Sequence, residues 1–270
     1  MPIRLIALDL DGTTLRHDLS VHPHVQEAFV GAREANVNLV IATGRAHQST
    51  VSIANRIGFE GSFVCINGAY ATNVHGETVF SSFLNEDVIS KVLEFADHRQ
   101  LHVSAYTPQG PVANRDSEWL TRYRELVKGI HVDVQAPDLL KQRSIHKLVI
   151  IADADQIPLL RADLQVELLG CGCQLTESAP QYLEILPEGT NKGNGLAQLC
   201  ASMGIDRSEV AAIGDYKNDL EMLAWVGTAG AVKNALDEVK SLAQIVVNSN
   251  EDGGAGEFIF ACLRLNCNSY

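Results

Sequence analysis

Short apolar runs along this chain alternate with longer amphipathic segments. Runs of three to six mostly apolar residues are typical of strands buried on both faces of a parallel sheet. Such runs lie at 3–8, 37–42, 62–66, 210–213 and 245–247. The segments between them repeat apolar residues every three or four positions, as a helix with one buried face does. This alternation predicts a doubly wound α/β core around a parallel sheet.

The amphipathic segments of this core predict helices that cover the sheet. They lie at 23–35, 47–57, 192–203, 235–243 and 254–265, with one more opening after the turn 214–219. In the first segment, Val25, Ala28, Phe29 and Ala32 fall on one helical face, which we expect to be buried.

From about residue 85 the pattern changes to a mixture of helices and short strands. Helices are expected near 86–99, 116–127 and 155–169, and strands near 101–106, 111–115, 146–152, 171–176 and 181–186. The core pattern resumes after residue 190, which favours an insertion over a separate C-terminal domain. We therefore expect a discontinuous core at 1–83 and 188–270 and an inserted α+β domain at 84–187.

Polar residues and glycines directly follow the predicted core strands. The clusters are Asp9 to Gly12, Thr43 to Arg45, Asn67 with Gly68, and Gly214 to Asp219, and Lys192 opens a predicted helix. The carboxyl ends of parallel strands line one crevice, so these groups would meet there. Each cluster also has a plain interpretation: an Asp-Gly turn or calcium loop, a helix N-cap, or a solvated lysine. Their order and placement favour the chemical interpretation.

Composition and charge exclude several classes of partner. The 270 residues carry a formal net charge of −12 without a clustered run of Lys and Arg, which argues against nucleic acid and anionic membranes. The sequence shows neither a signal peptide pattern nor an apolar stretch of membrane-spanning length. Six scattered cysteines without C-x-x-C pairs indicate reduced thiols and a cytoplasmic protein. Cys171 and Cys173 are expected to form part of a strand rather than a metal clip.

Together the clusters resemble the four ordered motifs of the haloacid dehalogenase-like superfamily of phosphatases, which have a Rossmann-like core. The matching motifs are Asp9-Leu10-Asp11-Gly12-Thr13, Thr43-Gly44-Arg45, Lys192-Gly193, and Gly214-Asp215 with Asn218-Asp219. Further segments resemble its Cof-type branch, which carries a large α/β cap: Asn67-Gly68-Ala69, Glu184-Ile185-Leu186-Pro187, Val239-Lys240 and Asn250-Glu251-Asp252-Gly253. The resemblance covers about 1–83 and 184–260.

The resemblance implies a Mg²⁺-dependent phosphatase of small phosphorylated metabolites, with sugar phosphates favoured. Asp9 would be the nucleophile that forms an aspartyl-phosphate, and Asp11 the general acid and base. The metal would be held by the Asp9 carboxylate, the Asp11 backbone carbonyl and Asp215, because a hard cation prefers oxygen ligands. Catalytic support from Thr43 and Lys192 is implied as well.

Several residues would bind the transferring phosphoryl group or support those that do. Thr43, Gly44 and Lys192 would contact its oxygens, because hydroxyl, N–H and ammonium groups all donate hydrogen bonds to an anion. Further candidates for substrate contact are Arg45, Asn67, Asn218 and Asn234, and Asp219 is expected to position Lys192. The chain departs from the branch at Tyr216, where Asn is common, and at Lys233, where glycine is usual.

Two other functions are compatible with parts of this pattern. A phosphomutase or phosphotransferase would pass the phosphoryl group to a sugar hydroxyl. A non-catalytic phosphate-binding module would use the same pocket, but it would not need Asp11 as a second acid. Specificity would come from residues of the inserted domain, with candidates His102, Tyr106, Arg115, Trp119, His146 and Lys147. The sequence leaves the oligomeric state open between monomer and homodimer.

Overall fold

The computed structural model describes residues 2–126 and 132–267 and contains two compact units. The first unit comprises residues 1–45, 50–80 and 191–270, and the second comprises residues 46–49 and 81–190. Each has its own sheet and its own apolar core.

The first unit is built on an eight-stranded sheet with the order β14-β13-β12-β1-β2-β3-β4-β5. Its strands are β1 (Leu5–Leu8), β2 (Asn38–Ala42), β3 (Ser62–Cys65), β4 (Tyr70–Thr72), β5 (Thr78–Ser81), β12 (Val210–Gly214), β13 (Thr228–Val232) and β14 (Ile245–Val247). From β14 to β3 neighbouring strands are parallel, and β4 pairs antiparallel with β3. The predicted parallel α/β core is confirmed.

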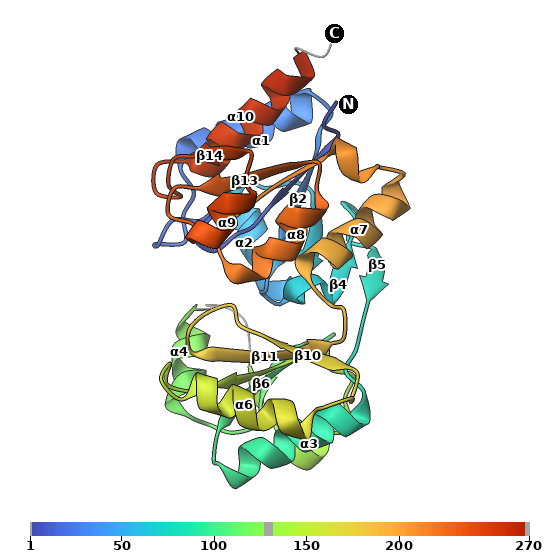
Figure 1. Cartoon of the computed structure of the whole chain (residues 1–270), viewed down its shortest axis with the longest axis vertical. Coiled ribbons are helices and arrows are strands. Elements are labelled where there is room, and N and C mark those ends of the chain that lie inside the picture. The colour runs from blue at the N-terminus through green and yellow to red at the C-terminus, as the bar shows by residue number, and fades with distance from the viewer. Residues whose placement is uncertain (1, 127–131, 268–270) are drawn as a thin grey trace. The chain divides into compact units, whose positions relative to one another are not determined.

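Helices cover both faces of this sheet, as right-handed crossovers require. They are α1 (Pro23–Glu34), α2 (His47–Ile57), α7 (Lys192–Met203), α8 (Leu220–Trp225), α9 (Asp237–Leu242) and α10 (Gly254–Cys267), with short 3₁₀ turns at Ile66–Gly68, Arg207–Glu209 and Lys217–Asp219. Helices α1 and α10 lie side by side (Figure 1). The four residues expected to face inward from α1 are all buried, which confirms the predicted face of that helix.

Three strands of the first sheet were not predicted from the sequence. Strands β4 and β5 are only three and four residues long, too short for a clear alternation of apolar and polar residues. Strand β13 contains Gly230, and glycine in a strand interior usually counts against a strand. The structure explains this glycine, because a Cβ there would lie 2.3 Å from the ring of Phe258 on α10. Gly230 thus lets α10 pack closely on the sheet.

The second unit contains a six-stranded sheet with the order β10-β11-β9-β6-β7-β8. Its strands are β6 (His102–Thr107), β7 (Gly110–Ala113), β8 (Asp133–Val134), β9 (Lys147–Ile151), β10 (Cys173–Thr176) and β11 (Tyr182–Pro187). Its helices are α3 (Glu86–His98), α4 (Glu118–Leu126), α5 (Pro137–Leu140) and α6 (Ile157–Glu167). All pairs are antiparallel except β7 with β8.

The cysteines of this unit differ in part from expectation. Cys171 lies in the turn before β10 rather than in a strand, and only Cys173 belongs to that strand. The expected helix near 116–127 is present as α4, and residue 127 lies outside the described residues. The sheet also holds a buried ion pair, in which Lys147 Nζ lies 2.9 Å from Glu184 Oε1.

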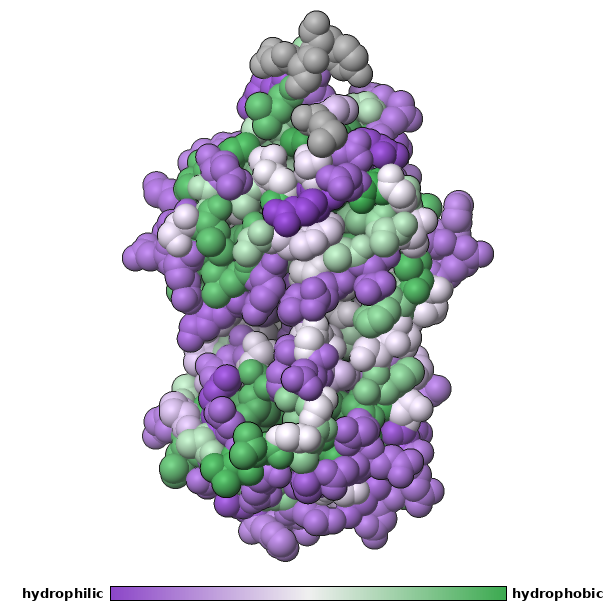
Figure 2. Space-filling model, turned by 45° about the vertical axis from the view of Figure 1, so that its right-hand side comes forward, coloured by the Kyte–Doolittle hydropathy of each residue, from purple (hydrophilic) through white to green (hydrophobic). Residues whose placement is uncertain are grey.

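The surface offers no broad apolar face in the view of Figure 2, where hydrophilic residues surround small separate apolar patches. The most exposed large apolar side chains are Leu169, Val166 and Leu159. Among the residues that the structure describes, none of the helices has the length and apolar character needed to cross a bilayer.

Candidate active site

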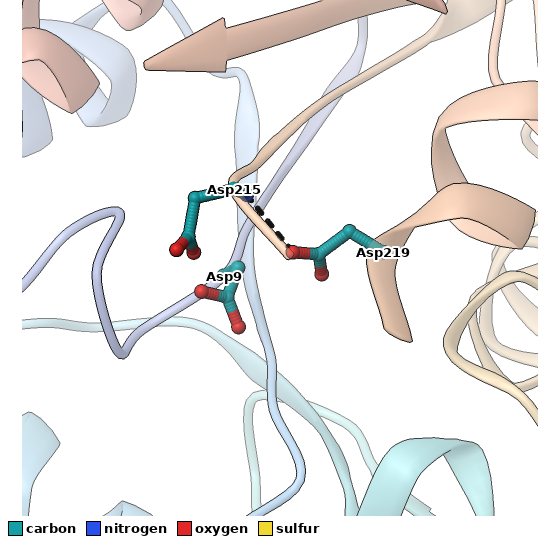
Figure 3. A group of neighbouring side chains, drawn as sticks. All are labelled: Asp9, Asp215 and Asp219. Atoms are coloured by element: carbon teal, nitrogen blue, oxygen red, sulfur yellow. Dashed lines mark hydrogen bonds between the residues drawn. The ribbon is translucent and has the colours of Figure 1, made fainter. Parts of the chain in front are cut away.

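Three aspartates converge at the carboxyl ends of β1 and β12 (Figure 3). Asp9 directly follows β1 and Asp215 directly follows β12, and the Asp9 N–H donates to the carbonyl of Ile213 at 3.1 Å. One carboxylate oxygen from each of Asp9, Asp215 and Asp219 lies within 4.8 Å of the other two. Adjacent parallel strands therefore bring together side chains that are more than 200 residues apart in sequence.

Both oxygens of Asp219 are occupied by donors from the site. Its Oδ2 accepts hydrogen bonds from the backbone N–H groups of Asp215 at 3.0 Å and Tyr216 at 3.1 Å. Its Oδ1 accepts from Lys192 Nζ at 2.7 Å. The contact from Tyr216 uses the backbone, which explains why an unusual side chain there does not disturb it. Gly214 makes room for this arrangement, because a Cβ would lie 2.4 Å from the Asp219 side chain.

Lys192 is a buried cation between two carboxylates. It is the first residue of α7, its side chain is 1% exposed, and its Nζ lies 2.6 Å from Asp9 Oδ1. Burial alone would lower the pKa of this lysine, but the charges of Asp219 and Asp9 outweigh burial and raise it. The ammonium therefore stays charged at neutral pH. Gly195 lets α7 pack closely against Gly68. A Cβ at position 195 would lie only 2.6 Å from Gly68 Cα.

The carboxyl groups of Asp9 and Asp215 both have raised pKa values. Burial raises the pKa of Asp9 well above its usual range, with Lys192 opposing and Asp219 and Asp215 adding to the shift. Burial, then the charge of Asp219, raises the pKa of Asp215 to about 6. Three clustered carboxylates beside a single lysine fit a divalent cation, because such an ion would offset their mutual repulsion and prefers oxygen ligands.

The loop after β1 turns back to hold Asp215. Thr13 Oγ1 donates to Asp215 Oδ1 at 2.8 Å, and Thr14 Oγ1 donates to the Asp9 carbonyl at 2.6 Å. Gly12 has a φ of 79°, and a Cβ on it would lie 2.5 Å from Asp215 Oδ2. Thr13 belongs to the first motif, yet sequence reasoning gave it no role, because nothing local shows that its hydroxyl reaches another strand.

We expect Gly12→Ala to weaken the site more than it weakens the fold. Left-handed backbone costs a non-glycine residue about 1–2 kcal/mol, and the added Cβ would also displace Asp215. Gly76→Ala is the matched control, because Gly76 shares the φ of 79° but has open space around it. Both variants should lose similar stability in thermal unfolding. Only Gly12→Ala should weaken the binding of a divalent cation titrated into the purified protein, by about tenfold; equal affinities in the two variants would contradict this prediction.

The loop after β2 is braced by Asn67. Thr43 is buried at the end of β2, and its carbonyl accepts the Asn67 N–H at 3.0 Å. Asn67 Oδ1 also accepts from Asn218 Nδ2 at 3.2 Å, so the amide links two loops of the site. Ile66 and Asn67 both have left-handed backbone, with φ of 54° and 52°. Such strain in a β-branched residue is uncommon and is often found at functional sites.

Asp11 lies outside the aspartate cluster and is paired with Arg45. Arg45 Nε lies 2.7 Å from Asp11 Oδ2, and one terminal nitrogen lies 2.6 Å from Oδ1. Asn234, another candidate for substrate contact, instead donates to the Gly12 carbonyl at 2.7 Å and accepts from the Asn250 N–H at 3.0 Å. It therefore braces the loop after β1. The unusual Lys233 beside it is exposed.

This chain is similar to known proteins both in sequence and in structure. A sequence profile of haloacid dehalogenase-like hydrolases matches residues 6–259. The protein YxeH of Bacillus subtilis is 30% identical over 95% of this chain and 97% of its own length. A pyridoxal phosphate phosphatase of Escherichia coli is 28% identical over 97% of this chain and 100% of its own length. A haloacid dehalogenase-like hydrolase from Bacteroides thetaiotaomicron has a solved structure with 28% identity and a TM-score of 0.85, covering 96% of this chain and 99% of that one.

Proposed function

This chain belongs to the haloacid dehalogenase-like hydrolases, and from that membership we propose that it is a Mg²⁺-dependent phosphatase of small phosphorylated metabolites. The observation that carries the proposal is the buried contact of 2.6 Å between Asp9 and Lys192, with the carboxylate of Asp215 beside it. A buried, oriented carboxylate at the carboxyl end of a strand suits a nucleophile.

In this proposal Asp9 attacks phosphorus and forms an aspartyl-phosphate. Lys192 holds Oδ1 of Asp9 and so fixes the rotation of the carboxylate, and we assign the attack to Oδ2. Asp11 gives a proton to the leaving oxygen and then takes one from the water that hydrolyses the intermediate. The Thr43 hydroxyl, the Gly44 N–H and the Lys192 ammonium would bind the transferring phosphoryl oxygens. Asn67 and Asn218 would hold that loop in place.

The proposed metal site consists of the Asp9 carboxylate, the Asp215 carboxylate and the Asp11 backbone carbonyl. Bound Mg²⁺ supplies the positive charge that lets an anionic carboxylate approach an anionic phosphate. Asp219 supports this site from behind, because its two oxygens serve Lys192 and the backbone of the Asp215 loop. Thr13 orients Asp215 through its hydroxyl.

Within the class of small phosphate monoesters we propose sugar phosphates and pyridoxal phosphate as the first substrates to test. Both release an aliphatic alcohol, which needs a proton from Asp11 as the ester bond breaks. The relative from E. coli supports the second choice by its activity on pyridoxal phosphate. The six cysteines are all free thiols, which supports a reducing compartment such as the cytoplasm.

A panel of phosphorylated metabolites tests this function. We expect release of inorganic phosphate with Mg²⁺ and its loss, by at least about a hundredfold, in a chelator. Restored activity after Mg²⁺ is added back would be the matching control. Transfer of phosphate to an added sugar instead of release to water would contradict hydrolysis as the main reaction. Equal rates with and without chelator would contradict the metal dependence.

The stabilisation by Mg²⁺ should also depend on pH. A folded-state pKa raised to about 6 for Asp215 means that the metal-free fold holds its proton more tightly than the unfolded chain does. Stability of the metal-free protein therefore falls as pH rises from about 4 to about 6. Mg²⁺ competes with that proton, so the rise in melting temperature that it causes should grow across the same window. A constant rise in melting temperature would contradict the assignment of Asp215.

A further inference from the structure

We propose that Arg45 is a positioning residue that acts through Asp11 and does not bind the phosphate itself. The inference rests on the proposed function, in which Asp11 protonates the leaving group. It concerns the bidentate ion pair between the two side chains. Both oxygens of the carboxylate are held by one planar guanidinium, at 2.7 Å and 2.6 Å.

The geometry explains why Asp11 needs such a partner. Its side chain is 49% exposed and follows the turn after β1, so by itself it could adopt several rotamers. A general acid is effective only when it is held in place, because misplacement by about 1 Å can cost two orders of magnitude in rate. A bidentate contact with arginine fixes both the position and the plane of a carboxylate. Arg45 would thereby set the direction from which Asp11 reaches the leaving oxygen.

Arg45 is itself firmly anchored to the loop that would bind phosphate. Its side chain is 12% exposed. Its backbone N–H donates to Thr43 Oγ1 at 3.2 Å, and its carbonyl accepts the Ile66 N–H at 3.0 Å. These contacts make Arg45 a rigid link between the loop after β2 and the acid on the loop after β1. The link would keep the acid in register with the phosphoryl group.

The rival role for Arg45 is a direct phosphate ligand, and the present contacts argue against it. Nε and one terminal nitrogen of the guanidinium already face the two oxygens of Asp11, so a phosphate that took the same two-pronged contact would have to displace that carboxylate. Displacing it would free Asp11 at the step that needs it fixed. The two roles also make opposite predictions for the formation of the aspartyl-phosphate. A phosphate ligand affects that step for every substrate, whereas a residue that acts through Asp11 affects it only where the leaving group needs a proton.

The test is a double-mutant cycle with two substrates. Wild type, Arg45→Gln, Asp11→Asn and the double variant are assayed on pyridoxal phosphate, which releases an alcohol, and on p-nitrophenyl phosphate, whose phenolate leaves without a proton. We expect Arg45→Gln to lower kcat for pyridoxal phosphate by about 10–100-fold, with KM within about threefold. On p-nitrophenyl phosphate the first burst of p-nitrophenolate, which reports the attack by Asp9 and needs no proton from Asp11, should keep its rate within about threefold. The double variant should be no slower than Asp11→Asn alone.

Two further variants separate positioning from general damage. Arg56→Gln removes an exposed arginine of α2 and should match wild type on both substrates. Arg45→Lys keeps the charge but cannot form the two-pronged contact, so it should recover only part of the lost kcat.

The outcomes distinguish this inference from the function on which it rests. A raised KM on both substrates, or losses that multiply in the double variant, would make Arg45 a phosphate ligand and overturn the inference alone. Faster turnover by Arg45→Gln would also overturn it, since the pair would then hold Asp11 away from the leaving group. If Asp11→Asn turns over pyridoxal phosphate at the wild-type rate, the acid assignment and this inference fall together.

Discussion

Asp9→Asn should abolish phosphatase activity, lowering kcat by at least about 10³–10⁴-fold, while the protein stays folded. The amide has the shape of the carboxylate but cannot form the covalent ester to phosphorus, and loss of a nucleophile is among the largest single effects in catalysis. The measurement is the release of inorganic phosphate at saturating Mg²⁺, with melting temperature as the measure of folding.

Stability should not fall with this loss of activity. Burial raises the pKa of Asp9, so the folded state tolerates its ionised form poorly at neutral pH. A neutral amide removes that cost, and Lys192 keeps its contact with Asp219. We expect the metal-free variant to melt at or above the wild-type temperature at pH 7. Asp18→Asn makes the same substitution on an exposed loop and should leave activity unchanged. Turnover by Asp9→Asn within tenfold of wild type would refute the assignment of the nucleophile.

The fold of the first unit could be predicted because its signals are local. Buried parallel strands read as apolar runs, and the face of α1 that contains Val25 and Phe29 follows from helical periodicity. The elements that were not predicted depend on contacts between segments that are distant in sequence. Strand β13 carries Gly230 because Phe258 on α10 occupies the space that a side chain would need. Nothing in the sequence around Gly230 indicates that Phe258 lies beside it.

The same division holds for the candidate site. The meeting of Asp9 and Asp215 could be predicted, since both follow strands of one parallel sheet and such strand ends share an edge. Three other features of the site could not be predicted, because each depends on the distance between loops that follow different strands. They are the hydrogen bond from Thr13, the left-handed backbone at Ile66 and the contacts of Asn234 with the loop after β1. The pairing of Arg45 with Asp11 belongs to the same group, because it joins the loop after β2 to the loop after β1.

Lys192→Met should remove activity and also cost the fold about 3–5 kcal/mol at neutral pH, since removing one partner of a buried ion pair leaves the other charges uncompensated. The methionine side chain has similar length and fills the space, so the loss would come from charge and not from a cavity. Asp9 and Asp219 would then share a buried site without the cation that now lies 2.6 Å and 2.7 Å away. Denaturant unfolding of the metal-free protein measures this loss directly.

The pH dependence of that loss identifies its cause. Without Lys192 the carboxylate of Asp9 loses the ammonium that opposes its shift, so the folded-state pKa of Asp9 should rise further. A raised pKa makes the folded state lose stability as pH rises through it, so the destabilisation of Lys192→Met should be largest near pH 7 and shrink towards pH 4. Lys240→Met is the matched control, because Lys240 pairs with the fully exposed Asp237 at 3.7 Å and such surface pairs contribute at most about 1 kcal/mol. A loss for Lys192→Met that is equal at both pH values would mean that packing, and not charge, makes this lysine necessary.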